Sequence, residues 1–267
     1  MMNINQLIFG RYLPGNSFVH RMDPRAKLLL SFYFVLVVFI ANDWCGYLFL
    51  ALVTLFCIKL SRIKIKVFIN GLKPLFVLIL ITILMQLFFT SGGHIYWQWG
   101  IFTLTSNGII SSVLITVRFI LIIFMSTLLT LTTTPMAIAD AMTALLRPLA
   151  RFHLPVDEIG LMLSIALRMV PTLADEATQV MAAQRARGID FNHGNLFKRG
   201  KALISLLIPM FVDSFNQATN LATAMEARGY QSGKPRTHYH QLHWQKTDTM
   251  ALIVMLLIIP VLVFLRK

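Results

Sequence analysis

The stretch MAAQRARGID, residues 181–190, returns 41 positions later as ATAMEARGYQ, residues 222–231. Each copy closes a long run with helical spacing that contains one proline, Pro171 in the first run and Pro209 in the second. The duplication predicts two similar helical arms with similar tips, and it suggests a part that engages two similar partners. The tips are the triplets Ala186, Arg187, Gly188 and Ala227, Arg228, Gly229.

An arginine in the last turn of a helix, followed by glycine, is in itself a common helix ending. The cation favours the negative end of the helix dipole, and glycine adopts the left-handed conformation of the cap. Two copies on arms of like design are much stronger evidence for a site than one copy. A guanidinium is always charged and presents a rigid fork to carboxylates and carbonyls. We therefore expect Arg187 and Arg228 to anchor the chain to partner proteins.

The composition of the whole chain is that of a polytopic membrane protein. Of its 267 residues, 57% are hydrophobic and 13% are charged, against about 45–50% and about 25% in soluble domains. The first two apolar runs are short, and they form either two spans in a thinned region or one incomplete hairpin. We predict an all-α protein with about five transmembrane helices and three amphipathic coupling helices. The apolar runs are 27–41, 45–60, 72–89, 109–131 and 249–265.

Lysine and arginine predict the orientation, because they accumulate on the cytosolic side of a membrane. Of the 24 basic residues, 21 lie in three groups, at residues 11–27, 59–73 and 147–246. The turn at 42–46 and the loop at 90–107 carry none. The net charge of +13 is therefore a topology signal and not a nucleic-acid footprint. We expect a multi-pass protein of the cell membrane with a cytoplasmic N-terminus.

Three regions follow from this reading. Residues 1–131 form an N-terminal membrane region with about four spans, 132–247 a cytosolic coupling region, and 248–267 a C-terminal transmembrane helix. Within the coupling region, Thr134-Pro135 predicts the start of a first amphipathic helix that ends at Pro155. Its apolar stripe comprises Ile138, Met142, Leu145, Leu149 and Phe152.

The two arms follow that helix. The first is expected from Asp157-Glu158 to Arg187, and the second from about Leu196 to Arg228, with breaks at Pro171 and Pro209. Apolar residues in the distal half of the second arm recur at helical spacing, so we expect the arms to pack along each other. These residues are Phe211, Phe215, Ala218, Ala222 and Met225.

Arg118 lies ~15 Å deep in the fourth run, where a cation costs at least a few kcal/mol unless it is paired or hydrated. A structural role, with the guanidinium bound to backbone carbonyls, and a functional role remain equally open. Tyr96, Trp97 and Trp99 cluster in the loop at 90–107. They form either an aromatic belt at the membrane edge, which we favour, or a substrate contact.

Catalytic and metal-binding readings find little support. The chain has no HExxH, CxxC or Gly-x-Ser-x-Gly motif. Gly194–Lys201 resembles a phosphate loop, but five residues separate its glycines, and Ala202 stands where a magnesium-binding hydroxyl belongs. We expect a non-catalytic chain without a metal or cofactor of its own.

The remaining candidate ligands are cysteines and histidines. Cys45 and Cys57 are 12 residues apart, or ~18 Å along a helix, which is too far for a disulfide. His238, His240 and His243 fall in a polar linker, where we favour a solvated segment over a metal site.

Four stretches together resemble a known family, the transmembrane T component of energy-coupling factor (ECF) transporters. They extend over most of the chain, and the last two end in the X-Arg-X motif of that family. The stretches are GRYLPGNSFVHRMDPRAKLL, LTTTP before an amphipathic helix, ALRMVPTLADEATQVMAAQRARG and LLIPMFVDSFNQATNLATAMEARGY.

The resemblance implies a scaffold between two cytosolic ATPase subunits, which hold ATP and magnesium, and one small membrane protein, the S component, which captures a vitamin or metal ion. It also implies that Arg187 and Arg228 each enter a groove of one ATPase. The alternatives are a conventional ABC permease subunit, which needs only one coupling helix, and a secondary transporter. A secondary transporter should carry ionisable residues within its spans, and only Arg118 fits that description.

Overall fold

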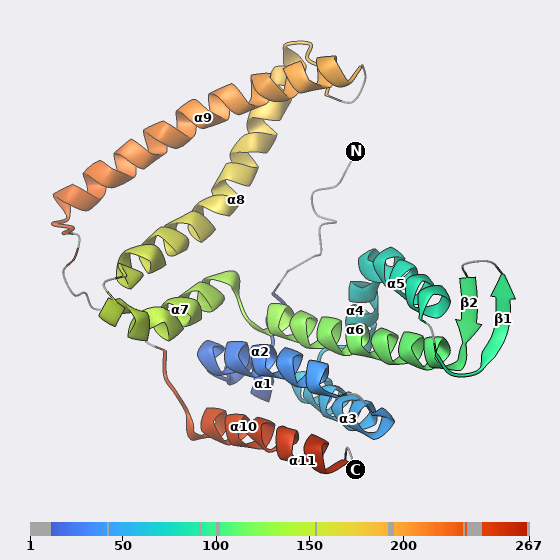
Figure 1. The fold of residues 1–267 in the computed structure, drawn as a ribbon. Helices are drawn as coiled ribbons and strands as arrows, with labels where there is room; N and C mark the ends of the chain where they lie inside the picture. Colours follow the sequence, from blue (N-terminus) through green and yellow to red (C-terminus); the bar gives the residue numbers. More distant parts are fainter. Residues whose placement is uncertain are drawn as a thin grey trace. The chain divides into compact units, whose positions relative to one another are not determined.

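The computed structural model describes eight stretches of the chain, which are 12–41, 43–90, 92–99, 102–152, 154–191, 195–231, 233 and 242–265. These residues form helices and one small hairpin, so the predicted all-α class is confirmed (Figure 1). They divide into two compact units, Met1–Ala141 with Gln241–Lys267, and Met142–His240. Residues named above that lie outside the described stretches are Gly194, His238 and His240.

The first unit contains the apolar helices. Among the described residues, three stretches are long and apolar enough to cross a membrane, namely α3 (Trp44–Ser61), the run Ile65–Phe89 and α6 (Ser106–Thr132). Helix α2 has 17 residues, which is the lower limit of about 17–25 residues for a span. The elements are α1 (Phe18–Arg21), α2 (Pro24–Ile40), α3 (Trp44–Ser61), α4 (Ile65–Leu72), a 3-10 turn (Lys73–Leu75), α5 (Phe76–Phe89), α6 (Ser106–Thr132), α10 (Lys246–Leu256) and α11 (Ile258–Leu265).

Helix α6 forms the centre of this unit, and α2, α3, α4 and α5 all pack against it (Figure 1). On the α4 side, the rings of Phe68 and Phe124 meet edge to face, with centroids 5.8 Å apart. Such close contact holds membrane helices together, because lipid offers no hydrophobic gain for helix association. Other buried members of the core are Phe34, Val37, Leu50, Leu121, Met125 and Leu128.

Arg118 is held inside this bundle. Its Nε donates to the hydroxyl of Tyr47 at 2.9 Å, and its Nη2 donates to the carbonyl of Ala41 at 3.4 Å. The guanidinium carbon also lies 5.4 Å from the ring centroid of Phe39 and 5.8 Å from that of Tyr47. One carbonyl, one hydroxyl and two ring faces stabilise the cation, so the structure supports the structural reading of this residue.

An antiparallel hairpin, β1 (Ile95–Trp99) with β2 (Phe102–Thr105), joins α5 to α6 where the sequence predicted only a loop. A signal for it was present, because Gly100-Ile101 is a Gly-X pair of the kind that two-residue hairpin loops favour. Tyr96 is exposed. The side chains of Trp97 and Trp99 lie outside the described part, so the aromatic belt stays a prediction.

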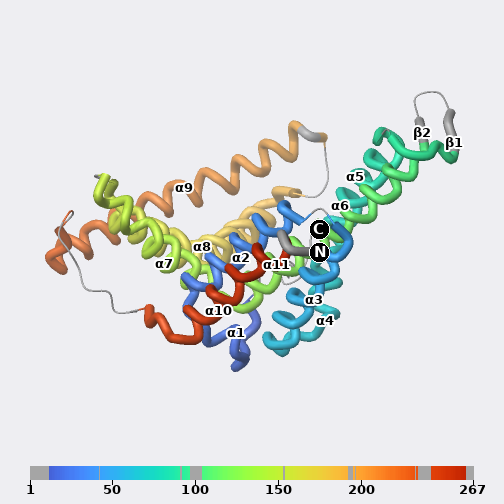
Figure 2. Tube along the Cα trace, turned by 60° about the horizontal axis from the view of Figure 1, so that its bottom comes forward, coloured from blue at the N-terminus to red at the C-terminus, as the bar shows by residue number. Residues whose placement is uncertain are grey.

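The C-terminal run was predicted as one helix, 249–265, and this is wrong. It forms two helices, α10 and α11, with a turn at Leu257, and α10 lies beside α2 (Figures 1 and 2). Pro260 explains the break, because it has no N–H to donate to the carbonyl of Leu256. The hydroxyl of Tyr33, on α2, donates to that carbonyl instead at 3.5 Å.

Asp248 ties the start of α10 to the start of α2. Its carboxylate is fully buried. One oxygen accepts from the backbone N–H of Gln245 at 2.9 Å, and the other accepts from the backbone N–H of Asp23 at 3.2 Å. The first bond belongs to a capping box with Gln245. A single side chain thus caps one helix and joins it to the N-cap residue of another.

The boundary between the two units falls within α7 (Pro135–Leu146). Thr134 caps this helix as predicted, since its hydroxyl accepts from the N–H of Ala137 at 3.2 Å. The α-helix ends at Leu146 and not at Pro155, and a 3-10 segment, Arg147–Phe152, follows. Pro148 accounts for the early end, because the residue before a proline is disfavoured in the α-helical region.

Candidate functional site

The two tips lie at the ends of the long helices α8 (Val156–Ala186) and α9 (Leu196–Ala227), which contain 31 and 32 residues. These bounds agree closely with the predicted arms. Pro171 lies inside α8 and Pro209 inside α9, so each helix lacks one internal hydrogen bond at its proline. Both prolines lie along the arms, well before the tips.

Each helix ends in the same hydrogen-bond pattern. At the end of α8, the N–H of Gly188 donates to the carbonyl of Arg185 at 2.9 Å, and Ile189 donates to Gln184 at 3.1 Å. At the end of α9, Gly229 donates to Glu226 at 2.9 Å, and Tyr230 donates to Met225 at 3.0 Å. Both pairs form a Schellman motif, which requires a left-handed residue after the cap. Gly188 and Gly229 meet this requirement with φ angles of 86° and 77°.

The cap residue itself is the arginine at both tips. Arg187 has φ −81° and ψ 6°, and Arg228 has φ −86° and ψ 6°, so the two side chains leave nearly identical backbones. Both are exposed. Among the described residues, neither guanidinium has a hydrogen-bond or ion-pair partner. Arg185, by contrast, lies 5.9 Å from the ring of Phe191.

The surroundings of the tips are open. A methyl group built on Gly188 or on Gly229 would meet no described atom within 4 Å. The preceding Ala186 and Ala227 are exposed and small. Each tip is therefore a narrow helix end that carries one exposed cation with five donors, and a groove lined with carboxylates or carbonyls would bind it.

Helices α8 and α9 run antiparallel within the second unit. The side-chain amide of Gln184 donates to the carbonyl of Ser205 at 3.2 Å, and nearer the middle of α8 the amide of Gln217 donates to Glu176. The two tips therefore lie at opposite ends of the pair (Figure 1). From Ser205, beside the first tip, α9 extends for roughly 35 Å to Arg228. The structure does not bring the two arginines together.

Gln184 also stabilises the break in α9, a role that sequence reasoning missed. Pro209 cannot donate to the carbonyl of Ser205, four residues earlier, and this is the carbonyl that Gln184 binds. The side chain of Gln184 is buried. In the duplicated sequence its counterpart in the second arm is Met225, which has no amide to donate. The available signal was the polar side chain of Gln184 at a position where the second stretch has an apolar one.

The apolar stripe of α9 faces outward. Phe211 and Phe215 are 67% and 62% exposed, and their rings contact each other at 5.1 Å. The predicted contact between the two arms is present, since α8 and α9 pack against each other, but it does not bury Phe211 or Phe215. Exposed apolar surface of this kind marks an interaction site or a membrane contact. Two further apolar residues at the same helical spacing, Ile204 and Ile208, extend this exposed stripe towards the start of α9.

The other candidate sites lie partly outside the described residues. The glycine-rich stretch is helical from Leu196 onward, and Gly200 lies inside α9 and not in a loop. His243 is exposed. In the described ranges, no three His, Cys, Asp or Glu side chains form a group that could hold a metal ion. Cys45 and Cys57 are both free thiols, as expected.

The glycines of the tips lead to a stability prediction. Gly188→Ala and Gly229→Ala should each destabilise the helix end by about 1–2 kcal/mol, because a Cβ disfavours the left-handed conformation. Amide hydrogen exchange in the last turn of α8 or α9 should become faster. The matched control is Gly200→Ala, which lies inside α9 with open space around it and should slow exchange slightly. Equal exchange in all three variants would contradict the assigned caps.

Comparison with known proteins places the chain among transport components. The family described as CbiQ, cobalt transport protein, matches residues 15–239, a range that includes both tips. The chain is 52% identical over 263 residues to the energy-coupling factor transporter transmembrane protein EcfT of Lacticaseibacillus paracasei, covering 98% of this chain and 100% of that protein. It is 51% identical to EcfT 1 of Listeria monocytogenes, covering 98% and 99%. It is 49% identical to EcfT of Lactococcus lactis subsp. cremoris, covering 98% of both chains.

Proposed function

The chain belongs to the CbiQ family of cobalt transport proteins and to the transmembrane components of energy-coupling factor transporters, and on this premise we propose that it couples two cytosolic ATPase subunits to a substrate-binding S component. It lies in the cell membrane with a cytoplasmic N-terminus, and it contributes no catalytic residue. ATP and magnesium are bound by the ATPases. The S component selects the vitamin or metal ion that is imported.

The observation that carries this proposal is the pair of matching tips. Two nearly identical backbone caps present two exposed guanidinium groups at opposite ends of one antiparallel helix pair. Each cation would enter an acidic or carbonyl-lined groove on one ATPase. Because the tips are roughly 35 Å apart, they engage grooves on two neighbouring ATPases and not a single groove. The roles of Ala186, Arg187, Gly188 and of Ala227, Arg228, Gly229 are part of this proposal.

Transmission of the ATPase movement follows from the length of the arms. When ATP draws the two ATPases together, their grooves displace the tips, and α8 and α9 carry that displacement along their axes. The outward stripe of α9, with Phe211 and Phe215, offers an apolar surface for the S component. Reorientation of the S component on this surface would release its substrate into the cytosol.

A chain with its own substrate path, whether a conventional ABC permease subunit or a secondary transporter, is the alternative. Such a path needs polar or ionisable groups free to meet a substrate within the spans. The sequence places Arg118 deep within a span, but its guanidinium already donates hydrogen bonds to Tyr47 and to the carbonyl of Ala41. This observation favours the coupling role.

The direct test is the composition of the complex purified in mild detergent. Intact-mass analysis should find this chain together with two ATPase subunits and one small integral membrane protein, and ATP hydrolysis should be absent from the isolated chain. Purification of the chain alone under conditions that preserve membrane complexes, or substrate uptake without any ATPase, would refute the coupling role.

A further inference from the structure

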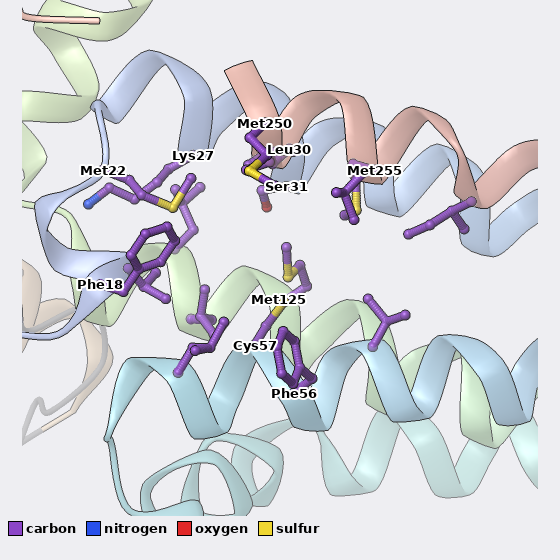
Figure 3. A pocket seen from close by; sticks show the side chains of 18 of the residues that line it. Phe18, Met22, Lys27, Leu30, Ser31, Phe56, Cys57, Met125, Met250 and Met255 are labelled. Carbon is purple, nitrogen blue, oxygen red and sulfur yellow. The ribbon is translucent and has the colours of Figure 1, made fainter. Parts of the chain in front are cut away.

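A cavity of about 760 Å³ lies in the first unit among α1, α2, α3, α6, α10 and α11 (Figure 3). Its walls are almost wholly apolar, built from leucine, phenylalanine, methionine, valine, alanine and isoleucine side chains. The polar residues that line it are Lys27, Ser31, Cys57 and Thr247. A volume within the ~300–1,000 Å³ of small-molecule sites, with this lining, suits a hydrocarbon ligand.

The cavity is a long groove with an open side. Along α10 and α11 its lining extends from Thr247 to Val261, roughly 20 Å of helix. The opposite wall is α3, one of the membrane-length helices. Side chains from both walls, such as Phe56 of α3 and Met250 of α10, line the groove and are also exposed. The groove therefore opens towards the hydrocarbon of a bilayer.

The groove is long and apolar. Its walls extend for roughly 20 Å along α10 and α11, and this length accommodates one extended acyl chain.

One end of the groove carries a buried cation. Lys27 is 6% exposed, and its Nζ donates to the carbonyls of His20 at 3.3 Å and Thr132 at 3.0 Å. An ammonium group has three donors, and these two carbonyls are the acceptors that the described residues provide. Figure 3 places Lys27 beside Met22 at one end of the groove, with Met255 well along it.

The charge around that end favours an anion. Arg25 and Lys246 add positive charge to that of Lys27, while Asp23 and Asp248 supply negative charge. Asp23 forms an ion pair with Arg25 at 3.9 Å. This pairing leaves Lys27 and Lys246 against Asp248, so the formal charge balance at this end is positive. Anionic lipid headgroups of the cytoplasmic leaflet provide the matching charge.

We propose that this groove binds one phospholipid of the leaflet that faces the basic loops. One acyl chain lies between α3 and the α10–α11 pair, and the glycerol-phosphate part lies at Lys27. The bound lipid fills the space that the proline break between α10 and α11 leaves beside α2, and it completes the packing of the C-terminal helices. This inference depends on the membrane placement of the first unit and not on the ATPase contacts.

Native mass spectrometry of the purified full chain, delipidated and then incubated with phosphatidylglycerol, tests the proposal. The wild type should retain one phosphatidylglycerol per chain. Ala251→Trp places an indole in the groove and should reduce that occupancy at least tenfold. The matched control is Ile253→Trp on the same helix, because Ile253 is 54% exposed and does not line the groove. It should retain the lipid as the wild type does.

Two further variants keep the test decisive. If Ala251→Trp does not fold, Ala251→Leu should show intermediate occupancy. Lys27→Met should reduce retention of phosphatidylglycerol more than retention of phosphatidylcholine, because only the anionic headgroup gains from the ammonium group. Absence of a retained lipid, equal loss in both tryptophan variants, or loss of a membrane protein subunit in place of a lipid would overturn the proposal.

Discussion

Reversal of both tip charges, by Arg187→Glu together with Arg228→Glu, is expected to abolish co-purification of the ATPases with this chain. An arginine anchor of an interface contributes about 2 kcal/mol or more, so each single change should weaken binding roughly 30-fold. A glutamate would also repel the acidic groove that an arginine selects, and it is unfavourable at a helix C-terminus. The two tips are far enough apart to act independently, so the double change should weaken binding by roughly 1,000-fold.

Matched variants separate this effect from a general loss of charge. Arg168→Glu makes the same charge change on the exposed surface of α8, before Pro171 and away from the last turn. It should leave co-purification intact. Arg187→Lys keeps the charge but loses the planar fork, and it should give a partial loss. Retention of both ATPases by the double glutamate variant would rule out the proposed contact.

The second large effect is expected at Asp248. Asp248→Ala removes the helix cap of α10 and leaves the buried N–H of Asp23 without its acceptor. A lost cap costs about 1 kcal/mol and an unsatisfied buried donor about 1–3 kcal/mol. We therefore expect the variant to lose about 2–4 kcal/mol of stability, seen as a lower thermal midpoint in detergent and faster proteolysis before α10.

The control variants for this prediction retain part of the geometry. Asp248→Asn keeps one carbonyl oxygen as an acceptor and should lose less stability than the alanine variant. Asp213→Ala removes an exposed carboxylate on α9 and should not change the midpoint. If Asp248→Ala has the same thermal midpoint and the same rate of proteolysis as the wild type, the link between α10 and α2 does not stabilise the protein.

Local signals predicted the arms almost to the residue. A cap, an apolar period and a glycine after the last turn lie within the helix they define, so α8 and α9 begin and end close to the expected positions. The run at 45–60 likewise became α3, Trp44–Ser61. The match at the tips has the same origin, because a Schellman motif depends on residues no more than five positions apart.

Features that depend on distant contacts or on single prolines were missed. Pro148 and Pro260 lie inside largely apolar segments. The average composition of such a segment does not reveal that one backbone N–H is missing. The partner of Arg118 is Tyr47, 71 positions away, and no local pattern identifies it. The period of Phe211 and Phe215 shows that they share a face, but it cannot show what covers that face. In the structure neither ring is covered by α8.

The bond from Gln184 to Ser205 makes the two arms mechanically unequal. Both helices contain a proline. In α9 the carbonyl freed by Pro209 is hydrogen-bonded to Gln184 of α8. In the described part of the chain, the carbonyl freed by Pro171, that of Leu167, has no such side-chain donor. A force that bends α9 at Pro209 must therefore either move the end of α8 with it or break this hydrogen bond. A load that bends α8 at Pro171 meets no such restraint. Two motors of equal strength, pushing on these arms, would thus produce strokes of different size.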